Sequence, residues 1–154
     1  MIEMQARMAD VYKIAAGGYQ AMVAMENYLR DSGVPQRILE LVRLRASQIN
    51  GCGICVDSHA HKAQKAGESD ERLWATAAWR DAPYFTDQER AALALTEAAT
   101  RIADSPSGVP DDVWNQAADH FDEEALAALV MAIASVNAWN RINVATRQIA
   151  GAYR

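Results

Sequence analysis

The chain has 154 residues, of which 51% are apolar and 23% are charged, a balance typical of a globular protein with one hydrophobic core. Its formal net charge of −5 argues against a nucleic-acid partner, because phosphate binding requires a basic surface. The first residues carry no basic start and no apolar signal core, and no apolar stretch approaches the roughly 20 residues that cross a bilayer. We therefore expect one domain over residues 1–154, in the cytoplasm, with no membrane partner.

Helix signals dominate the first half of the chain. Gly17-Gly18 is expected to separate a short N-terminal helix from a longer one, whose apolar residues recur at helical spacing until Ser32-Gly33. Pro35 fits the first position of the next helix, which a turn at Asn50-Gly51 ends. Gly67 can close the helix that follows this turn. The expected helices run over residues 19–31, 35–49 and 52–66.

The second half of the chain is also predicted to be helical. Asp70 can cap a helix that Pro83 ends, and Thr86 to Glu89 forms a capping-box pattern before an Ala-rich helix that runs through Ile102. Pro110 opens a short helix, and Asp122 can cap a long last helix that continues to about residue 149. Since alternating β patterns are almost absent, the fold class predicted for the chain is all-α.

The only two cysteines, Cys52 and Cys55, lie three residues apart, and His59 follows four residues later. On a helix that begins at Cys52, the three side chains share one face at about 100° per residue. A reducing compartment favours a catalytic or metal-binding pair over a structural disulfide. The helix N-terminus favours the thiolate form, and the histidine can take or return a proton. The pattern is that of a redox dithiol with a nearby base.

Three other interpretations of these residues stay open. Cys52, Cys55, His59 and His61 could bind zinc, but His61 is expected on the opposite side of the helix, beside solvent, so a fourth ligand would have to come from His120 or a carboxylate. Alternatively, the cysteines and His59 are only packed in the core. An oxidation sensor without turnover is a further possibility for the same dithiol.

The run from Glu40 to His59 closely resembles the core motif of the alkylhydroperoxidase D-like branch of the carboxymuconolactone decarboxylase family. The motif is a glutamate, twelve residues to Cys52, three to Cys55 and four to the histidine, with a core that spans residues 40–67. The segments 89–97 and 137–141 are also similar. The resemblance covers most of the chain, from about residue 19 to residue 147.

This resemblance implies a compact orthogonal bundle of about six to eight helices that assembles into homo-trimers or homo-hexamers. It also implies a peroxidase-type dithiol that needs no cofactor or metal and is served by a proton relay of Glu40, Cys52, Cys55 and His59. The substrate would be a peroxide, and the reductant would be an external dithiol or a thiol protein. Without the resemblance, Glu40 would be interpreted as a surface ion pair with neighbouring arginines.

The chain departs from the family pattern at one point. Some members carry a histidine between the two cysteines, where this chain has Gly53-Ile54. The decarboxylase branch lacks the cysteine pair, so decarboxylation is not expected. We therefore expect a cysteine-based peroxidase, with general thiol–disulfide exchange as the alternative, and a subunit boundary near the helix 52–66. Asn140 and Arg141 could face either the site or that boundary.

Overall fold

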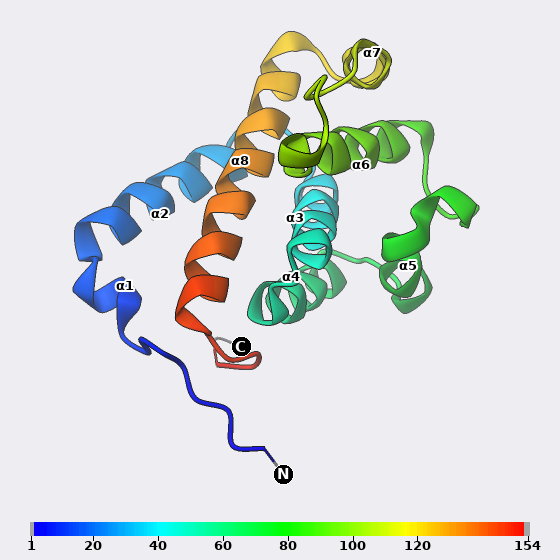
Figure 1. Ribbon diagram of the computed structural model, residues 1–154. Coiled ribbons are helices and arrows are strands. Elements are labelled where there is room, and N and C mark those ends of the chain that lie inside the picture. Colours follow the sequence, from blue (N-terminus) through cyan, green and yellow to red (C-terminus); the bar gives the residue numbers. More distant parts are fainter. Residues whose placement is uncertain (1, 153–154) are drawn as a thin grey trace.

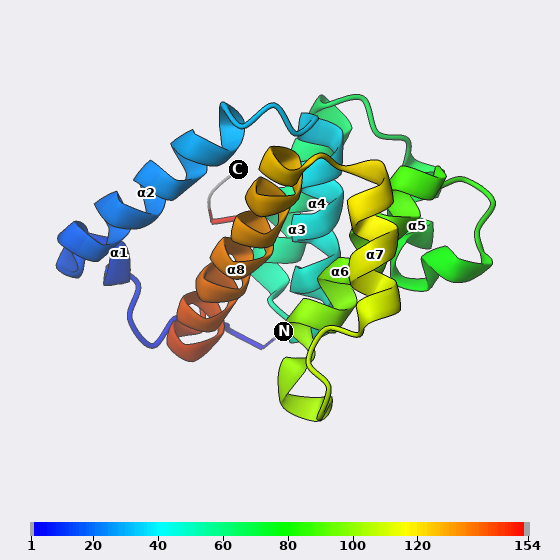
Figure 2. The same ribbon diagram turned by 90° about the horizontal axis from the view of Figure 1, so that it is seen from above.

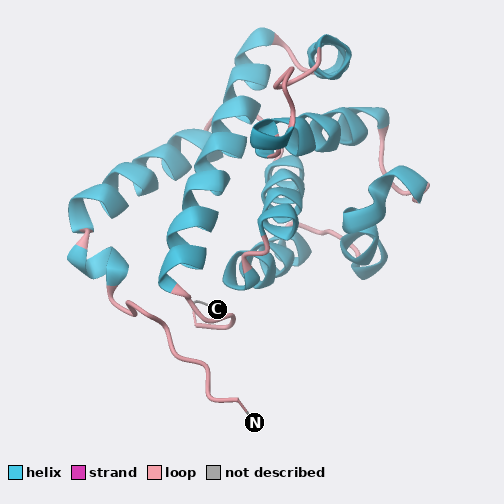
Figure 3. Cartoon of the chain, in the orientation of Figure 1, coloured by secondary structure: helices cyan, strands magenta, loops and turns pink. Residues whose placement is uncertain are grey.

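The computed structural model describes residues 2–152, and within that range the chain forms eight α-helices and two short 3₁₀ helices, with no strand (Figures 1 and 3). The elements, in chain order, are α1 (Val11–Ile14), α2 (Ala16–Arg30), α3 (Gln36–Asn50), α4 (Gly53–Lys65), α5 (Asp70–Ala75), η1 (Thr76–Asp81), α6 (Asp87–Thr100), η2 (Ile102–Asp104), α7 (Asp111–His120) and α8 (Glu123–Thr146).

Helix α3 lies at the centre of the molecule and packs against α4, α6 and α8. Helix α2 runs beside α8, and α7 packs on α6; the helices cross one another instead of forming one parallel bundle (Figures 1 and 2). The largest cluster of buried apolar side chains joins α2, α3, α6, α7 and α8. This arrangement confirms the predicted all-α, orthogonal helical fold.

Helix α8 corrects one expectation from the sequence. Its length and composition would be sufficient to cross a membrane, although no apolar stretch of that length was expected. Its buried residues pack against α2, α3 and α6, and they include Leu129, Ile133 and Val136. The apolar character of α8 therefore serves the protein core.

Several predicted helix boundaries differ from the observed ones. Gly17 and Gly18 lie inside α2, because the chain breaks two residues before Gly17, at Ala15. The cap of α5 is Ser69, whose hydroxyl accepts from the Arg72 amide, and not the neighbouring aspartate. Thr86 caps α6 with the predicted capping box, in which both reciprocal bonds to Glu89 are present. Helix α8 ends at residue 146 instead of 149.

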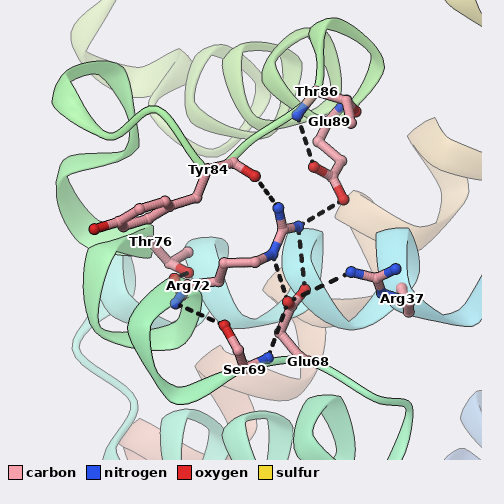
Figure 4. Close-up of polar contacts among 8 residues, drawn as sticks. All are labelled: Arg37, Glu68, Ser69, Arg72, Thr76, Tyr84, Thr86 and Glu89. Atoms are coloured by element: carbon pink, nitrogen blue, oxygen red, sulfur yellow. Dashed lines mark hydrogen bonds and ion pairs between the residues drawn. The ribbon is translucent and has the colours of Figure 1, made fainter.

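A cluster of ion pairs ties α5 to the rest of the fold (Figure 4). The Arg72 guanidinium donates to the buried carboxylates of Glu68 and Glu89 and to the carbonyl oxygen of Tyr84. Arg37 on α3 lies 3.6 Å from Glu68 and adds a further ion pair. Because Arg37 lies on α3, Glu89 lies on α6, and Glu68 and Tyr84 lie in the loops before α5 and after η1, the cluster fixes the position of α5 in the fold.

Candidate active site

The turn between α3 and α4 places the cysteine pair at a helix N-terminus. Gly51 adopts a left-handed conformation with φ of 65°, which a residue without a Cβ accommodates most easily. The Gly51 amide donates to the Gln48 carbonyl and the Cys52 amide donates to the Ser47 carbonyl, the two bonds of a Schellman motif. Cys52 then becomes the N-cap of α4.

Cys52 and Cys55 form a disulfide in the structure, with their Cα atoms 5.2 Å apart. Both side chains are almost completely buried, with exposed fractions of 1% and 4%. Reversible closure of such a ring requires two cysteines within reach on the same face, which the helix start provides. The structure therefore shows the oxidised state of a CxxC pair that is shielded from bulk solvent.

His59 is held by Glu40 from the neighbouring helix. Nδ1 of the ring lies 2.8 Å from Oε2 of the carboxylate, and the Glu40 side chain has an exposed fraction of only 1%. A carboxylate at this position favours the tautomer with the proton on Nδ1, which leaves Nε2 as the acceptor. The contact thus prepares His59 to take a proton at Nε2.

Basic neighbours keep the Glu40 carboxylate ionised. Burial raises its pKa, but the hydrogen bond and charge of His59, with the charges of Arg43 and Lys62, outweigh burial and leave the pKa below its ordinary value. The second carboxylate oxygen, Oε1, accepts from Arg43 at 2.7 Å and from Gln36 at 2.8 Å. Both oxygens therefore have fixed partners, and Glu40 can stabilise an imidazolium on His59.

The ion-pair chain continues beyond Arg43 to two further helices. The second guanidinium nitrogen of Arg43 lies 2.5 Å from Glu26 on α2. The other oxygen of Glu26 accepts from Ser135 at 2.6 Å and from the indole of Trp139 at 3.0 Å, both on α8. Helices α2, α3 and α8 thus share one polar network that orients Glu40.

A cavity of about 660 Å³ opens beside this network. It is lined by Cys55 and His59 from α4, but Cys52 is not among its lining residues. Tyr12, Tyr19 and Trp139 form an aromatic wall, with neighbouring ring centroids 5.3 to 6.0 Å apart. The remaining lining residues are Ala9, Asp10, Lys13, Val23, Glu26, Arg43, Ile54, Ser58, Lys62, Val136 and Asn143.

Asn143 is the polar side chain of α8 that approaches the disulfide. Its Nδ2 lies 3.4 Å from Sγ of Cys55, and its Oδ1 accepts from the hydroxyl of Tyr12 at 2.5 Å. Both contacts join residues that are far apart in the sequence, so neither could be predicted from local spacing. The site is therefore built from α1, α2, α3, α4 and α8 together.

The structure brings all four predicted site residues into one region. Glu40 contacts His59 directly, and Cys55 and His59 border the same cavity. His61 lies apart from this group, half exposed, with Nδ1 bonded to the carbonyl oxygen of Asp57. Within residues 2–152, no group of three or more histidine, cysteine or acidic side chains is arranged to hold a metal ion.

Asn140 and Arg141 have different positions. The Asn140 side chain is buried, donates to Ser47 and accepts from Asn50, both on α3. The Arg141 side chain is exposed and bonds Asn137 on its own helix. Neither residue lines the cavity, so Asn140 joins α3 to α8 and does not face the site.

Sequence reasoning missed several residues of the cavity. Trp139 was not predicted to belong to the site, but it lines the cavity and donates to Glu26. Tyr12 and Asn143 were not singled out at all. The contact of Arg43 with Glu40 could have been predicted, because residues three apart on a helix are neighbours and Glu40 precedes Arg43 at that spacing.

Comparison with known proteins identifies the family. The chain belongs to the carboxymuconolactone decarboxylase family, whose model matches residues 16–98. An uncharacterised protein of Bacillus subtilis, YdfG, is 38% identical over 134 residues, which cover 87% of this chain and 90% of that protein. Alkyl hydroperoxide reductase AhpD of Coxiella burnetii is 38% identical over 65 residues, which cover 41% of this chain but only 37% of AhpD.

A solved structure extends the similarity to nearly the whole chain. The crystal structure of ATU0492 from Agrobacterium tumefaciens is described as a protein of unknown function and a candidate AhpD antioxidant defence protein. It shares 37% sequence identity with this chain, with a TM-score of 0.89, and the match covers 95% of this chain and 98% of that one. The fold is therefore of the AhpD-like type.

Proposed function

We propose that the protein is a cysteine-based peroxidase that reduces hydrogen peroxide or organic hydroperoxides with the Cys52–Cys55 dithiol. The observation that carries this proposal is the placement of Cys55 and His59 on one cavity, with His59 bonded to the buried carboxylate of Glu40. A thiol that meets a small-molecule cavity beside an oriented base has the features of an activated nucleophile. The likeness to AhpD supports the same reaction class.

In the proposed reaction, Nε2 of His59 takes the Cys55 proton, directly or through a water molecule, and Glu40 stabilises the imidazolium. The thiolate attacks one peroxide oxygen, the O–O bond breaks, and His59 returns the proton to the departing alkoxide or hydroxide. The products are a Cys55 sulfenic acid and an alcohol or water. The Cys52 thiol then displaces water from this sulfenic acid and closes the disulfide. An external dithiol returns two electrons and two protons by exchange.

The order of the two cysteines follows from their positions. Cys55 lines the cavity and lies one helical turn before His59, whereas Cys52 does not line the cavity. A peroxide that enters the cavity would therefore meet Cys55 first. Cys52 is close enough to act as the resolving thiol, as the disulfide itself demonstrates. These positions support Cys55 as the attacking cysteine.

The burial of both sulfur atoms supports a small oxidant over a protein disulfide. With exposed fractions of 1% and 4%, the two cysteines offer no surface on which a folded disulfide substrate could dock. The cavity provides the route to Cys55, and its volume of about 660 Å³ accommodates the organic part of a hydroperoxide. The same route would have to admit the thiol of the reductant.

Steady-state peroxide consumption with several dithiol donors tests the proposal. Wild-type protein should turn over, the Cys52→Ser variant should consume one equivalent of peroxide when the donor is left out, and the Cys55→Ser variant should not react. Sustained turnover by Cys55→Ser would contradict the assignment. Disulfide formation without turnover for any donor would indicate a redox sensor, and zinc that resists mild chelation and protects both thiols would indicate a metal-binding module.

A further inference from the structure

The contact between Asn143 and Cys55 supports a functional role for Asn143. Nδ2 of Asn143 is 3.4 Å from Sγ of Cys55, and both residues line the cavity that the proposed substrate would enter. A disulfide sulfur is a weak acceptor, whereas a thiolate is a charged one, and hydrogen bonds to charged groups are roughly twice as strong as neutral ones. The contact should therefore become stronger when the disulfide is reduced.

We propose that Asn143 is a catalytic residue whose side-chain amide holds the negative charge on the Cys55 sulfur, and that Tyr12 is the positioning residue that fixes this amide. The assignment rests on the proposed function only in taking Cys55 as the reacting thiol. The proton of Cys55 passes to His59, and the Asn143 amide donates to the sulfur that keeps the negative charge.

The orientation of the amide decides whether Asn143 helps or hinders the thiolate. An asparagine side chain has a donating end and an accepting end, and only the donating end can bond a thiolate. Tyr12 donates its hydroxyl proton to Oδ1 of Asn143 at 2.5 Å. This bond turns Nδ2 toward the sulfur of Cys55.

The position of Tyr12 is itself fixed by α8 and by aromatic packing. The backbone amide of Arg7 donates to the carbonyl oxygen of Thr146 at 2.8 Å, which attaches the segment before α1 to the end of α8. The Tyr12 ring lies 5.3 Å from the ring of Tyr19 and 5.4 Å from that of Trp139. Tyr12 therefore reaches Asn143 from a backbone that is bonded to the same helix.

Ionisation of Cys55 is the property that this proposal predicts, and it can be measured without peroxide. In a Cys52→Ser background, the rate of alkylation by iodoacetamide as a function of pH reports the pKa of the single remaining thiol. Asn143→Leu removes the donor at similar volume, Asn143→Asp replaces it with a carboxylate, and Tyr12→Phe removes only the orienting hydroxyl. Asn115→Leu, an exposed asparagine on α7, is the matched control.

We expect Asn143→Leu to slow alkylation on the order of tenfold below the thiol pKa, because a hydrogen bond to a charged group is lost. Asn143→Asp should slow it further, since the carboxylate repels the thiolate. Tyr12→Phe should slow it by a smaller factor, because the amide loses its fixed orientation. Asn115→Leu should match the wild-type background.

Unchanged alkylation profiles for both Asn143→Asp and Tyr12→Phe would overturn the proposal. These two substitutions are nearly isosteric, so the result stays interpretable even when the leucine variant fails to fold. The alkylation result does not depend on whether the protein reduces peroxides. A reduced wild-type protein that consumes no peroxide would refute the peroxidase assignment while a shifted ionisation in the Asn143 variants still supported this role.

Discussion

The carboxylate of Glu40 lies 2.8 Å from Nδ1 of His59, although the two residues belong to different helices and are 19 positions apart. This contact connects the central helix α3 to α4, which carries the cysteine pair. Arg43 and Gln36 bind the other oxygen of the same carboxylate, so Glu40 is held from both sides. A histidine supported in this way has a defined tautomer.

The relay makes a prediction about thiol reactivity. Glu40→Gln and His59→Ala should slow peroxide reduction, because a proton-transfer residue typically contributes ~10²–10⁴-fold. The loss should be largest at low pH, where fewer thiols ionise without assistance. Pre-steady-state rates between about pH 5 and 8 provide the measurement. His61→Ala is the control and should leave the rate nearly unchanged. If Glu40→Gln and His59→Ala both react at the wild-type rate across this pH range, the relay assignment is wrong.

Glu40 should also make stability depend on pH. Its folded-state pKa lies below the ordinary value of 4.5, so its stabilising contribution is complete above that value and is lost as the pH falls through the lower folded-state pKa. We expect the unfolding free energy of Glu40→Gln to fall less steeply in acid than that of wild type. At neutral pH the variant should lose on the order of 3 kcal/mol, as for other broken buried pairs.

Glu97 offers a matched control for this experiment. Burial raises its pKa, but hydrogen bonds from Arg80, Trp79 and Arg45 and the charge of Arg80 leave the net pKa below its ordinary value, and Glu97 does not line the active-site cavity. Glu97→Gln should therefore also make the unfolding free energy fall less steeply in acid than that of wild type. Thiol reactivity should not change. Denaturant unfolding at a series of pH values compares the three proteins. If the unfolding free energy depends on pH in the same way for wild type and both variants, the lowered pKa values of Glu40 and Glu97 do not explain the acid sensitivity.

Asn140 is expected to matter for stability and not for chemistry. Its amide is 1% exposed and bridges Ser47 and Asn50, so Asn140→Ala leaves buried polar groups without partners. A loss of about 1–3 kcal/mol should follow, measured by urea unfolding. Alkylation of the reduced thiols should stay at the wild-type rate. A stable variant with slow thiol chemistry would instead assign Asn140 to the site.

We propose that the protein assembles into a homo-trimer or homo-hexamer, as the family likeness implies, and that a subunit boundary lies near α4. Trp74 on α5 is 75% exposed, and its neighbour Leu73 belongs to the same apolar cluster as Ala63 on α4. A subunit boundary there would cover this indole, so Trp74→Ala should shift the protein to smaller species without altering its far-UV circular dichroism. Light scattering provides the measurement. A monomer at all concentrations of the wild-type protein would refute the expected assembly.

The elements most accurately predicted from sequence were those specified by local chemistry. The capping box at Thr86 and the turn at Asn50-Gly51 satisfy backbone groups with nearby atoms, so they could be recognised from neighbouring residues alone. Gly17-Gly18 failed as a break because two glycines destabilise a helix interior by only about 1 kcal/mol each. Packing of the apolar face of α2 on α8 outweighs that loss.

The candidate site also contains residues that local spacing predicts and residues that only the packing of distant helices brings together. Cys55 and His59 lie four residues apart, and helical periodicity alone predicted that they share one face. Cys52 lies just before α4 and does not line the cavity. Glu40 required a family resemblance, because nothing in its spacing indicated burial. Asn143 lies 88 residues from Cys55, so its approach to the sulfur depends on how α8 crosses α4. Periodicity describes one helix at a time and carries no information about such crossings.

The most direct test of the central claim is a single turnover of the reduced Cys52→Ser variant with one equivalent of an organic hydroperoxide. Mass spectrometry of the product, trapped with a sulfenic-acid reagent, locates the oxidised residue. We expect one equivalent of the reagent adduct on Cys55, an equal amount of alcohol, and a rate that falls when His59 is replaced by alanine. An unmodified Cys55 thiol, with the hydroperoxide intact, would contradict the assignment of Cys55 as the peroxide-reducing residue.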